Sequence, residues 1–534
     1  MERPTKVLIV GGGSSGWMAA AYLNALLKQI DSNRVEITLV ESPDTPRSDV
    51  ARATTPSIRK MLSIIDIDFI DFMKSVNGTY KQSTRYENWL DNAGEYYHHP
   101  FTRYPSQPVD LTGEFWLRSN RSIPFMETTS PQPMICELGL APRPMGRKLK
   151  GPRLKFAYHL NALKFADYLC EHSKERGVTH YLDNVTDVEM RENGEIEAVK
   201  TESGNRIEAD LFVDCTGFTG LLCEKALDVK WVDFSKWLIC DRALVMPVPY
   251  EAHYPGFVRS HTMANAMSSG WIWDIPLQDR RGVGYVHSSS FISEEEAERE
   301  IRGYEGAHAD NLDTQFVDFK AGMREKAWFR NCIAIGHSGG FIEPLESTGL
   351  YLSQVAIEML AEHFPRDNNF EPLAFRVNRV MQNRFHEILD FINMHYCLTR
   401  RTDTEFWREV GRPERVTDRL QAKLDYWRMK PPSVSDFSDQ FLPGMKESAS
   451  PSDSGDDTRT PIDTAGLWDH SSYQAILYGM DFLSEECDAW FGKDRPPSAT
   501  HSRTIEALQR ASETLPKHEA FLRDILDMPE YPSD

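Results

Sequence analysis

The 534-residue sequence lacks several features that would each define a class of protein. No apolar stretch approaches the roughly 18 residues that a membrane-spanning helix needs, so we expect no membrane association. The eight cysteines are scattered without a CxxC pair, which argues against a metal site or a disulfide framework and fits a reducing compartment. No internal repeat is present.

Positive charge is also scarce. Sixty Lys and Arg against 80 Asp and Glu leave a formal net charge of −20. This balance disfavours nucleic acid and anionic membranes as partners and favours a soluble cytoplasmic protein. The first ten residues hold one short apolar run leading into Gly11, which predicts a buried strand rather than a signal sequence. The length predicts one large two-part enzyme or two to three domains.

A strand, a glycine-rich turn, a helix and a second strand open the chain. Residues 6–10 are typical of a buried parallel strand, residues 17–23 favour a helix, and residues 34–40 are typical of a second strand. The sequence Gly-Gly-Gly-Ser-Ser-Gly at residues 11–16 lies between the first strand and the helix. This order is the context in which a glycine motif indicates a dinucleotide-binding fold.

Within the turn, Gly11, Gly13 and Gly16 fill the pattern GxGxxG. The first glycine permits the tight turn, the second lets the backbone approach a pyrophosphate, and the third lets the helix pack close to its strand. The pyrophosphate would sit at the helix N-terminus beside Ser14, and Glu41 would accept hydrogen bonds from ribose hydroxyls. FAD and NAD both remain open at this point, and a turn that binds nothing is the alternative.

Further elements follow along the chain. We expect strands at residues 183–190, 196–201 and 206–214, and helices at residues 155–174, 349–363 and 373–395. The strand at 206–214 closes on Asp-Cys-Thr-Gly, which favours FAD over NAD. Residues 446–463 are rich in Ser, Asp and Pro and predict a mobile surface loop.

An aromatic segment, Gly-Trp-Ile-Trp-Asp-Ile-Pro, occupies residues 270–276. By itself it predicts an aromatic strand, and core packing is the simplest role for its tryptophans. Beside a flavin, however, the bulky rings of Trp271 and Trp273 would keep an organic substrate away from the cofactor. Only something small, such as a halide ion, would then reach it.

Three motifs together carry a family resemblance. With GGGSSGW at residues 11–17, the segment at 270–276 and EPLESTG at 343–349, the chain resembles the flavin-dependent tryptophan halogenases nearly end to end. Further matching segments lie at residues 53–58, 157–159, 335–336, 390–396 and 473–480.

The resemblance implies an α/β fold. A GxGxxG FAD-binding Rossmann-like core with sheet insertions would be joined by a mainly helical C-terminal part that forms the substrate wall. We expect residues 1–395 to form the FAD-binding and catalytic core, and residues 396–534 to form the helical part packed on it. No clean boundary divides the two.

By the same resemblance, Lys81 is the lysine that stands across a tunnel from the flavin. Hypohalous acid would reach it, and Lys81 would either form an N-haloamine or hold the acid by a hydrogen bond. Glu346 is the matching carboxylate beside the lysine, able to stabilise a cationic ring intermediate and accept its proton. From residue type alone, Lys81 would be a solvated surface lysine and Glu346 a helix-capping acid.

The resemblance also assigns residues to the flavin and to the halide. Backbone groups around Thr348 and Gly349 would hold the halide, since exposed N–H groups at a helix start suit an anion. Residues near the flavin would be Ala53, Thr54, Gly336, Trp271 and Trp273.

For the substrate, His99 and Phe101 match the His-x-Phe pair that sandwiches an indole, because flat aromatic substrates need aromatic faces at close range. Trp468 and Tyr473 would form a second wall. A core histidine bonded to the backbone is the alternative for His99, and core packing is the alternative for Trp468 and Tyr473.

The chain departs from the family pattern in the strap that covers the flavin. Where the family usually has Gly-x-Gly-Glu-Ala-Thr, residues 49–54 are Asp-Val-Ala-Arg-Ala-Thr. If the replaced glycines need positive φ, Asp49 and Ala51 would strain the strap, while Arg52 reverses a charge. His337 stands for the usual Asp or Asn, and Asn161 for Asp. We expect weaker flavin binding, which suits an enzyme that receives reduced flavin.

These observations predict a flavin-dependent halogenase that uses FADH2, O2 and chloride or bromide on tryptophan or another electron-rich aromatic. No second GxGxxG is present for NAD(P)H, so a separate flavin reductase would supply FADH2. A homodimer is one expected form. The alternatives are a single-component aromatic flavin monooxygenase and a flavin-binding protein impaired in catalysis. The substrate, ring position and halide preference stay open.

Overall fold

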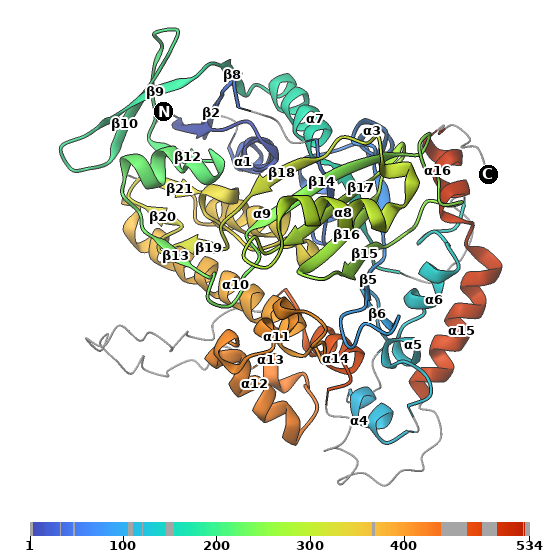
Figure 1. Ribbon diagram of the computed structural model, residues 1–534. Coiled ribbons are helices and arrows are strands. Elements are labelled where there is room, and N and C mark those ends of the chain that lie inside the picture. Colours follow the sequence, from blue (N-terminus) through green and yellow to red (C-terminus); the bar gives the residue numbers. More distant parts are fainter. Residues whose placement is uncertain are drawn as a thin grey trace.

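The computed structural model describes residues 4–31, 34–45, 49–104, 110–119, 121–145, 154–365, 369–438, 467–482, 499–526 and 528. Two large sheets lie at its centre, and helices cover them on several sides (Figure 1). In the described residues, no helix is long and apolar enough to cross a bilayer. The same residues contain no group of three or more His, Cys, Asp or Glu side chains placed to hold a metal ion.

The first large sheet carries the glycine-rich turn. Its strand order is β20-β21-β12-β1-β2-β8, and every pairing except β20-β21 is parallel. The strands are β1 (Thr5–Val10), β2 (Val35–Glu41), β8 (Thr179–Leu182), β12 (Leu211–Asp214), β20 (Trp328–Phe329) and β21 (Cys332–Ala334). The last four residues of β1 are buried, as expected for a central parallel strand. Helix α1 (Ser14–Ile30) packs against α7 (Ala162–Glu175) and α9 (Thr348–Glu362).

The second large sheet carries the aromatic segment. Its order is β18-β14-β17-β16-β15-β5-β6, and only the β15-β5 pairing is parallel. The strands are β5 (Ser83–Glu87), β6 (Tyr96–Pro100), β14 (Arg242–Pro249), β15 (Thr262–Ala266), β16 (Gly270–Pro276), β17 (Arg280–His287) and β18 (Gln315–Asp318). All seven residues of β16 are buried, because the strand lies in the middle of the sheet with both faces covered.

Three small sheets complete the β structure. The sheet β3-β7-β4 contains β3 (Ala51–Ala53), β4 (Thr79–Lys81) and β7 (Ala157–Asn161), so one strand lies between the strap and Lys81. The other two are β11-β10-β9, with β9 (Val185–Met190), β10 (Ile196–Thr201) and β11 (Arg206–Glu208), and β13-β19-β22, with β13 (Trp231–Asp233), β19 (Gly322–Arg324) and β22 (Gly340–Phe341).

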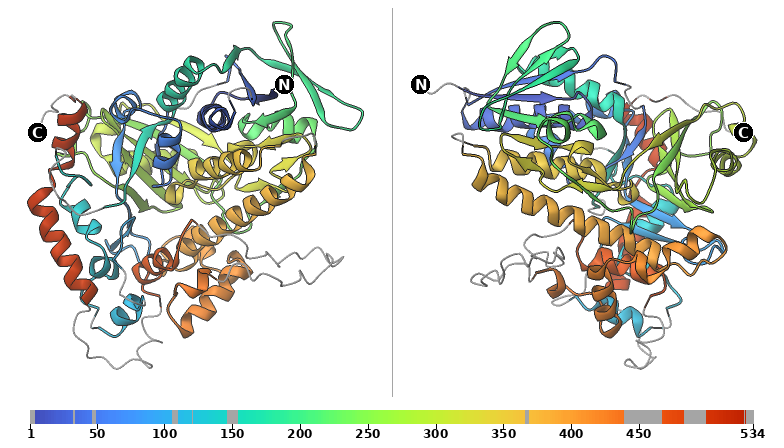
Figure 2. Two further views of the ribbon diagram at one scale, coloured as in Figure 1. Left: turned by 180° about the vertical axis from the view of Figure 1, so that it is seen from behind. Right: turned by 60° about the vertical axis from the view of Figure 1, so that its left-hand side comes forward.

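Helices enclose the sheets and form most of the C-terminal part. Shorter helices are α2 (Ile58–Ile64), α3 (Phe69–Ser75), α4 (Thr112–Leu117), α5 (Phe125–Thr129), α6 (Gln132–Glu137) and α8 (Glu294–Glu305). Later helices are α10 (Glu371–Cys397), α11 (Glu405–Val410), α12 (Asp418–Met429), α13 (Ser435–Ser438), α14 (His470–Gly479), α15 (Ala499–Thr514) and α16 (His518–Leu526). Figure 2 shows the long helix α10 running beneath the first sheet and α15 standing beside the short helices α5 and α6.

The structure confirms most predicted elements and corrects two. The expected helix at residues 155–174 begins only at Ala162, because residues 157–161 form strand β7 between β3 and β4. The expected strand at 206–214 is two strands in different sheets, β11 and β12, since the chain leaves one sheet for the other between them. The predicted loop at 446–463 lies outside the described residues. The division at residue 395 stays a prediction, and α10 runs through it.

Candidate active site

The glycine-rich turn between β1 and α1 has the geometry that its motif predicts. A Cβ atom on Gly11, whose φ is +112°, would lie 2.3 Å from the carbonyl oxygen of Cys215. On Gly16 it would lie 1.9 Å from the carbonyl oxygen of Gly11, so both positions require glycine. Gly13 faces open space, which leaves room for a ligand at the start of α1.

Glu41 lies at the end of β2 beside this turn. Its Oε2 accepts a hydrogen bond from Trp17 Nε1 at 3.1 Å, and the side chain is nearly buried. Gly336, with φ +75°, approaches α1 so closely that a Cβ would lie 2.5 Å from Ser15 Oγ. Glu41, assigned from the glycine motif, and Gly336, assigned from the family resemblance, therefore both lie beside the first turn of α1, where a dinucleotide would approach the fold.

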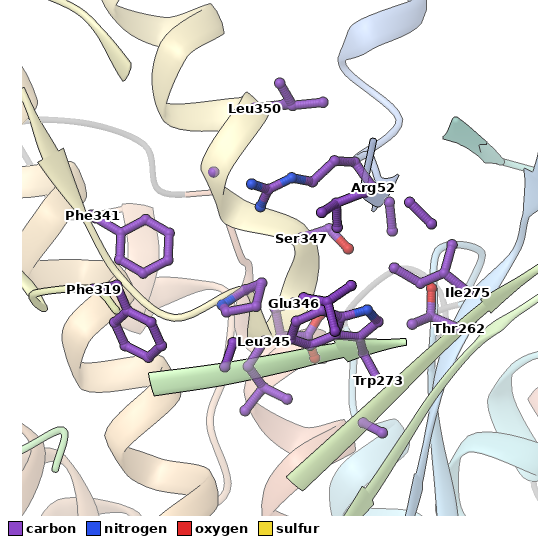
Figure 3. A pocket seen from close by; sticks show the side chains of 18 of the residues that line it. Arg52, Thr262, Trp273, Ile275, Phe319, Phe341, Leu345, Glu346, Ser347 and Leu350 are labelled. Atoms are coloured by element: carbon purple, nitrogen blue, oxygen red, sulfur yellow. The ribbon is translucent and has the colours of Figure 1, made fainter. Parts of the chain in front are cut away.

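A deep cavity opens between β16, the strap and the start of α9 (Figure 3). Trp271, Trp273 and Ile275 from β16 line it together with Arg52 and Ala53 from the strap. Further lining residues include Phe218, Phe319, His337, Phe341, Leu345, Glu346, Ser347, Gly349 and Leu350. The lining is mostly apolar, with polar groups confined to a few positions.

Two tryptophans form one wall of this cavity. Trp271 Nε1 donates to Glu343 Oε2 at 2.9 Å, and Tyr396 Oη donates to the same oxygen at 2.5 Å. Burial raises the pKa of Glu343 to about 7, so this carboxyl is largely protonated at slightly acidic pH. The buried N–H of Trp273 has no partner among the described residues, which marks it as a donor available to a ligand.

The altered strap is not strained. Neither Asp49 nor Ala51 has positive φ in the described backbone, so the strain expected from replacing glycine is absent. Asn161 Nδ2 donates to Asp49 Oδ1 at 2.5 Å, and Arg280 Nη2 donates to Asp49 Oδ2 at 2.8 Å. An aspartate at 161 would instead repel Asp49, so two departures from the family pattern are complementary. Gly282 leaves the space that the Ala51 methyl occupies.

Lys81 lies at the end of β4 and is buried, with 1% of its surface exposed. Its Nζ donates a hydrogen bond to Ser347 Oγ at 2.6 Å, and Ser347 lines the cavity. The amine also lies 5.4 Å from the ring centre of Phe101. Burial lowers the pKa of Lys81 to about 8, although the negative charge of Glu346 acts in the opposite direction.

Glu346 lies in a left-handed backbone conformation, with φ 64° and ψ 11°, just before α9. Its side chain makes no capping hydrogen bond to α9, and its negative charge acts on Lys81. Glu346 Oε1 accepts hydrogen bonds from Tyr86 Oη and from His99 Nδ1, the latter at 2.7 Å. His395 Nε2 lies 3.7 Å from the same oxygen.

The charge of Glu346 is stabilised by these neighbours. Burial alone would raise its pKa, but the hydrogen bond from His99 and the nearby imidazole of His395 outweigh that effect and hold the pKa well below its usual range. The carboxylate is therefore ionised and fixed in position. It lines the cavity while its hydrogen bonds reach back toward β5 and β6.

Three of the expected substrate residues, His99, Trp468 and Tyr473, contact Phe391 of α10. The ring of His99 lies 5.8 Å from that of Phe391, and the indole of Trp468 stacks on Phe391 at 3.9 Å. Tyr473 packs edge-on against Phe391 and also contacts Phe437. Phe391 thus contacts residues of both predicted walls, and Phe101 is the one of the four that the structure places beside the Lys81 amine, at 5.4 Å.

The remaining residues assigned to the flavin or the halide differ in where their side chains lie. Ala53 and Gly349 line the cavity, whereas Thr348 is fully buried and its hydroxyl has no partner among the described residues. The Thr54 hydroxyl donates to the carbonyl of Tyr158 and accepts from its N–H, both at 2.9 Å. Thr54 therefore anchors the strap to β7.

The residues present fit a flavin cofactor. The glycine turn has an open approach at Gly13, and the cavity has flat aromatic walls, an orphaned donor at Trp273 and a cationic side chain at Arg52. Backbone N–H groups at a helix start together with aromatic walls suit the pyrophosphate and the ring of a flavin dinucleotide.

A family model described as tryptophan halogenase matches residues 6–493. The chain belongs to the tryptophan halogenase family. It is a flavin-dependent halogenase. The tryptophan 7-halogenase RebH of Lentzea aerocolonigenes is 34% identical and covers 97% of this chain and 98% of its own length. The tryptophan 6-halogenase SttH of Streptomyces toxytricini is also 34% identical, over 81% of this chain and 85% of its own.

Solved halogenase structures share the fold. The tryptophan halogenase of Shewanella frigidimarina superposes with a TM-score of 0.85 at 32% identity, covering 98% of both chains. The flavin-dependent halogenase BrvH of Brevundimonas superposes with a TM-score of 0.79 at 30% identity, covering 98% of this chain and 99% of its own. The two alternatives, a single-component monooxygenase and an impaired flavin-binding protein, find no support in these comparisons.

Several residues of this halogenase site were not singled out from the sequence. Ser347 holds the amine of Lys81, and Tyr86 and His395 surround Glu346. Ser347 adjoins Glu346 in sequence and could have been suspected from that position. Tyr86 and His395 carry no local signal, because their proximity to Glu346 depends on how β5 and α10 pack.

Proposed function

We propose that this halogenase acts on tryptophan or another electron-rich aromatic molecule, with Lys81 and Glu346 as its catalytic residues. The observation that carries the proposal is the placement of a buried amine beside an ionised carboxylate at the edge of the aromatic cavity. A buried lysine with a lowered pKa has little structural value, because burying its charge is costly. Its position is therefore best explained by chemistry.

We propose FAD, delivered as FADH2 by a separate flavin reductase, as the cofactor. Gly11, Gly13, Ser14, Gly16 and Glu41 would hold its dinucleotide part. Ala53, Thr54, Gly336, Trp271 and Trp273 would surround the remainder. Bound reduced flavin, together with O2 and a chloride or bromide held near Thr348 and Gly349, supplies hypohalous acid. Trp271 and Trp273 keep the organic substrate away from this step.

Lys81, whose amine is hydrogen-bonded to the cavity-lining Ser347, would receive the hypohalous acid. With a pKa of about 8, the amine is neutral in a useful fraction of molecules near neutral pH, and the neutral amine is the nucleophilic form. Attack on hypohalous acid forms an N–halogen bond and releases water. The halogen then passes to a ring carbon, and the two electrons of its N–halogen bond return to the nitrogen, which takes up one proton and becomes the neutral amine again. An ammonium that holds the acid by a hydrogen bond is the other route.

Glu346 acts on the ring. Its negative charge stabilises the cationic intermediate that forms when the halogen adds, and its carboxylate accepts the ring proton as aromaticity returns. His99 donates to the carboxylate and His395 lies beside it, so the proton has neighbouring groups to which it can pass. The ring position would follow from which carbon faces Lys81. The equal identity to a 6-halogenase and a 7-halogenase favours neither position.

Replacing Lys81 tests the proposal. Purified wild type and Lys81→Met are supplied with FAD, a flavin reductase, NADH and bromide, and tryptophan, indole and a phenol are offered separately. We expect mass spectrometry to detect brominated product with wild type and none with Lys81→Met, while both proteins oxidise FADH2 at similar rates. Persistent halogenation by the variant would refute the role of Lys81. Failure of wild type on all three substrates would refute the proposed substrate class.

A further inference from the structure

Arg52 is a cation placed inside the cofactor cavity. It lies in the middle of β3, between buried Ala51 and Ala53, and its side chain lines the cavity. Figure 3 shows its guanidinium reaching across the cavity toward α9, the helix that carries Leu350. Among the described residues that line this cavity, it is the only arginine or lysine.

Within the described part of the chain, this guanidinium has no counter-charge. The described residues give it no hydrogen bond and no ion pair, and burial, which lowers its pKa, is the sole influence on its ionisation. Glu346 also lines the cavity, but its carboxylate is engaged by Tyr86 and His99. An arginine cannot readily lose its proton, so the cavity contains a guanidinium that none of the described residues pairs.

The neighbouring His337 does not change this balance. Its ring stacks on Phe218 at 4.9 Å, and burial together with the charge of Arg52 lowers its pKa to about 3. His337 is therefore neutral at physiological pH. An unpaired cation in an apolar cavity is unfavourable unless a ligand brings negative charge, so Arg52 indicates that the occupant is anionic.

Three parts of the proposed reaction carry negative charge: the pyrophosphate of FAD, the halide ion and the ring of reduced flavin. The cavity lining contains none of the glycines of the GxGxxG turn, so the pyrophosphate belongs to the other end of the cleft. The reduced ring is anionic at neutral pH, whereas the oxidised ring is neutral. The cavity is broad and walled by Trp271 and Trp273, which suits a flat ring better than a single ion.

We propose that Arg52 selects the reduced, anionic form of the flavin over the oxidised form. The inference rests on the proposed use of FADH2 delivered by a separate reductase, and it adds a specificity-determining residue. A guanidinium near the ring would strengthen binding of the charged form without a comparable gain for the neutral one. The protein would then capture the cofactor that it needs and release the spent one.

Anaerobic titration of the flavin-free protein tests this inference directly. Wild type, Arg52→Gln, Arg52→Lys and Arg280→Gln are titrated with reduced FAD and separately with oxidised FAD. We expect Arg52→Gln to weaken binding of reduced FAD at least about tenfold while changing oxidised FAD less than about threefold. Arg52→Lys should retain most of the preference. Arg280→Gln removes a charge paired with Asp49 outside the cavity lining and should leave the preference unchanged.

Measuring the midpoint potential of FAD bound to the wild-type protein tests the inference about Arg52 without any variant. Preferential binding of the reduced form raises the midpoint potential of bound FAD above that of free FAD by about 30 mV for each tenfold preference. A wild-type potential equal to or below that of free FAD would overturn the inference. An equal loss of affinity for reduced and oxidised FAD in Arg52→Gln would also overturn it, because Arg52 would then act on the pyrophosphate. A change in Arg52→Gln that is confined to bromide affinity would overturn it as well.

These measurements do not require halogenation. Lys81→Met should show the wild-type preference for reduced FAD, so the inference about Arg52 and the catalytic role of Lys81 can fail independently. Reduced lumiflavin, which lacks the phosphates, should still bind more weakly to Arg52→Gln than to wild type. Equal binding of reduced lumiflavin to both proteins would count against the ring as the partner of Arg52.

Discussion

The cofactor cavity and the lysine site are adjacent, yet they are built in opposite ways. In the cavity, Arg52 and the N–H of Trp273 have no partners among the described residues. At the lysine site, Lys81 is bonded to Ser347, and Glu346 accepts hydrogen bonds from Tyr86 and His99. Unpartnered groups indicate where a ligand must complete the structure. Partnered groups indicate where the protein has already fixed its reactive atoms.

We expect the largest effect on product formation from replacing Glu346 at the lysine site. Glu346→Gln keeps the volume of the side chain but removes the charge that would stabilise the cationic ring and the base that would accept its proton. We expect product formation to fall about 10²- to 10³-fold, with FADH2 oxidation unchanged. Single-turnover assays with mass spectrometry measure both rates. A decrease of less than about threefold would show that the fixed carboxylate is not catalytic.

The burial of Lys81 should be visible as a cost in stability. Because the folded pKa is lowered from 10.5 to about 8, the unfolded state binds more protons between these values. Stability should therefore rise with pH across that interval, and the full penalty, about 3 kcal/mol from the pKa difference, is present below pH 8. Lys81→Met removes the charge, and we expect it to be about 1–3 kcal/mol more stable at pH 7.

Urea unfolding of wild type and Lys81→Met between pH 7 and 10 measures this difference. The gap should narrow as the pH rises above 8, since the folded lysine is then neutral and the proton that the unfolded lysine still holds is released more easily on folding. Lys28 of α1, which is half-buried but has its amine in an exposed hydrogen bond to the Arg176 carbonyl, offers the matched control. Lys28→Met should change stability little and show no comparable trend with pH. A less stable Lys81→Met at every pH would contradict a penalty from burial.

Replacing Ser347 should have a smaller effect on product formation and tests how the lysine site is fixed. Its hydroxyl accepts a hydrogen bond from Lys81, which favours the charged amine. If the neutral amine reacts, wild-type product formation rises with pH to a bend near 8, and Ser347→Ala should move that bend to lower pH. The change in maximal rate should be less than about tenfold. A rate that falls above pH 8 would favour the ammonium route through a hydrogen-bonded acid.

Glu343 should have the smallest effect on turnover, since it supports Trp271 and does not line the cavity. Glu343→Gln keeps an acceptor for both donors, and we expect activity within about twofold of wild type. The pKa of Glu343 is raised to about 7, so wild-type stability should fall as pH rises from about 4.5 to 7. The variant should lack this decrease. Thermal unfolding at pH 5 and pH 8 would reveal whether the slopes differ.

Local sequence patterns predicted the parts of the fold that depend on neighbouring residues. The apolar run of β1, the glycine turn and the helix after it were all predicted in place, because each needs only its own residues and their periodicity. The expected helix at 155–174 was wrong in its first third. There, pairing of β7 with β3 and β4 outweighs helix propensity.

The strap, residues 49–54, shows the same limit of local sequence patterns at the candidate active site. Considered without their neighbours in the fold, Asp49 and Ala51 predicted backbone strain. Whether either residue is strained depends on the residues that it contacts. Asn161 and Arg280 hold Asp49, and Gly282 makes room for Ala51. These partners lie more than 100 residues away in the sequence, so no local pattern could identify them.

Residue identities alone determined the family, the glycine turn and the residue types available for catalysis. The tertiary structure decided what those residues can do. Lys81 and Ser347 are 266 positions apart, and their contact depends on how β4 packs against the segment before α9. The pKa of a side chain is set by the water it loses and the charges it meets. Both come from distant segments, so the acid–base character of this site exists only in the folded protein.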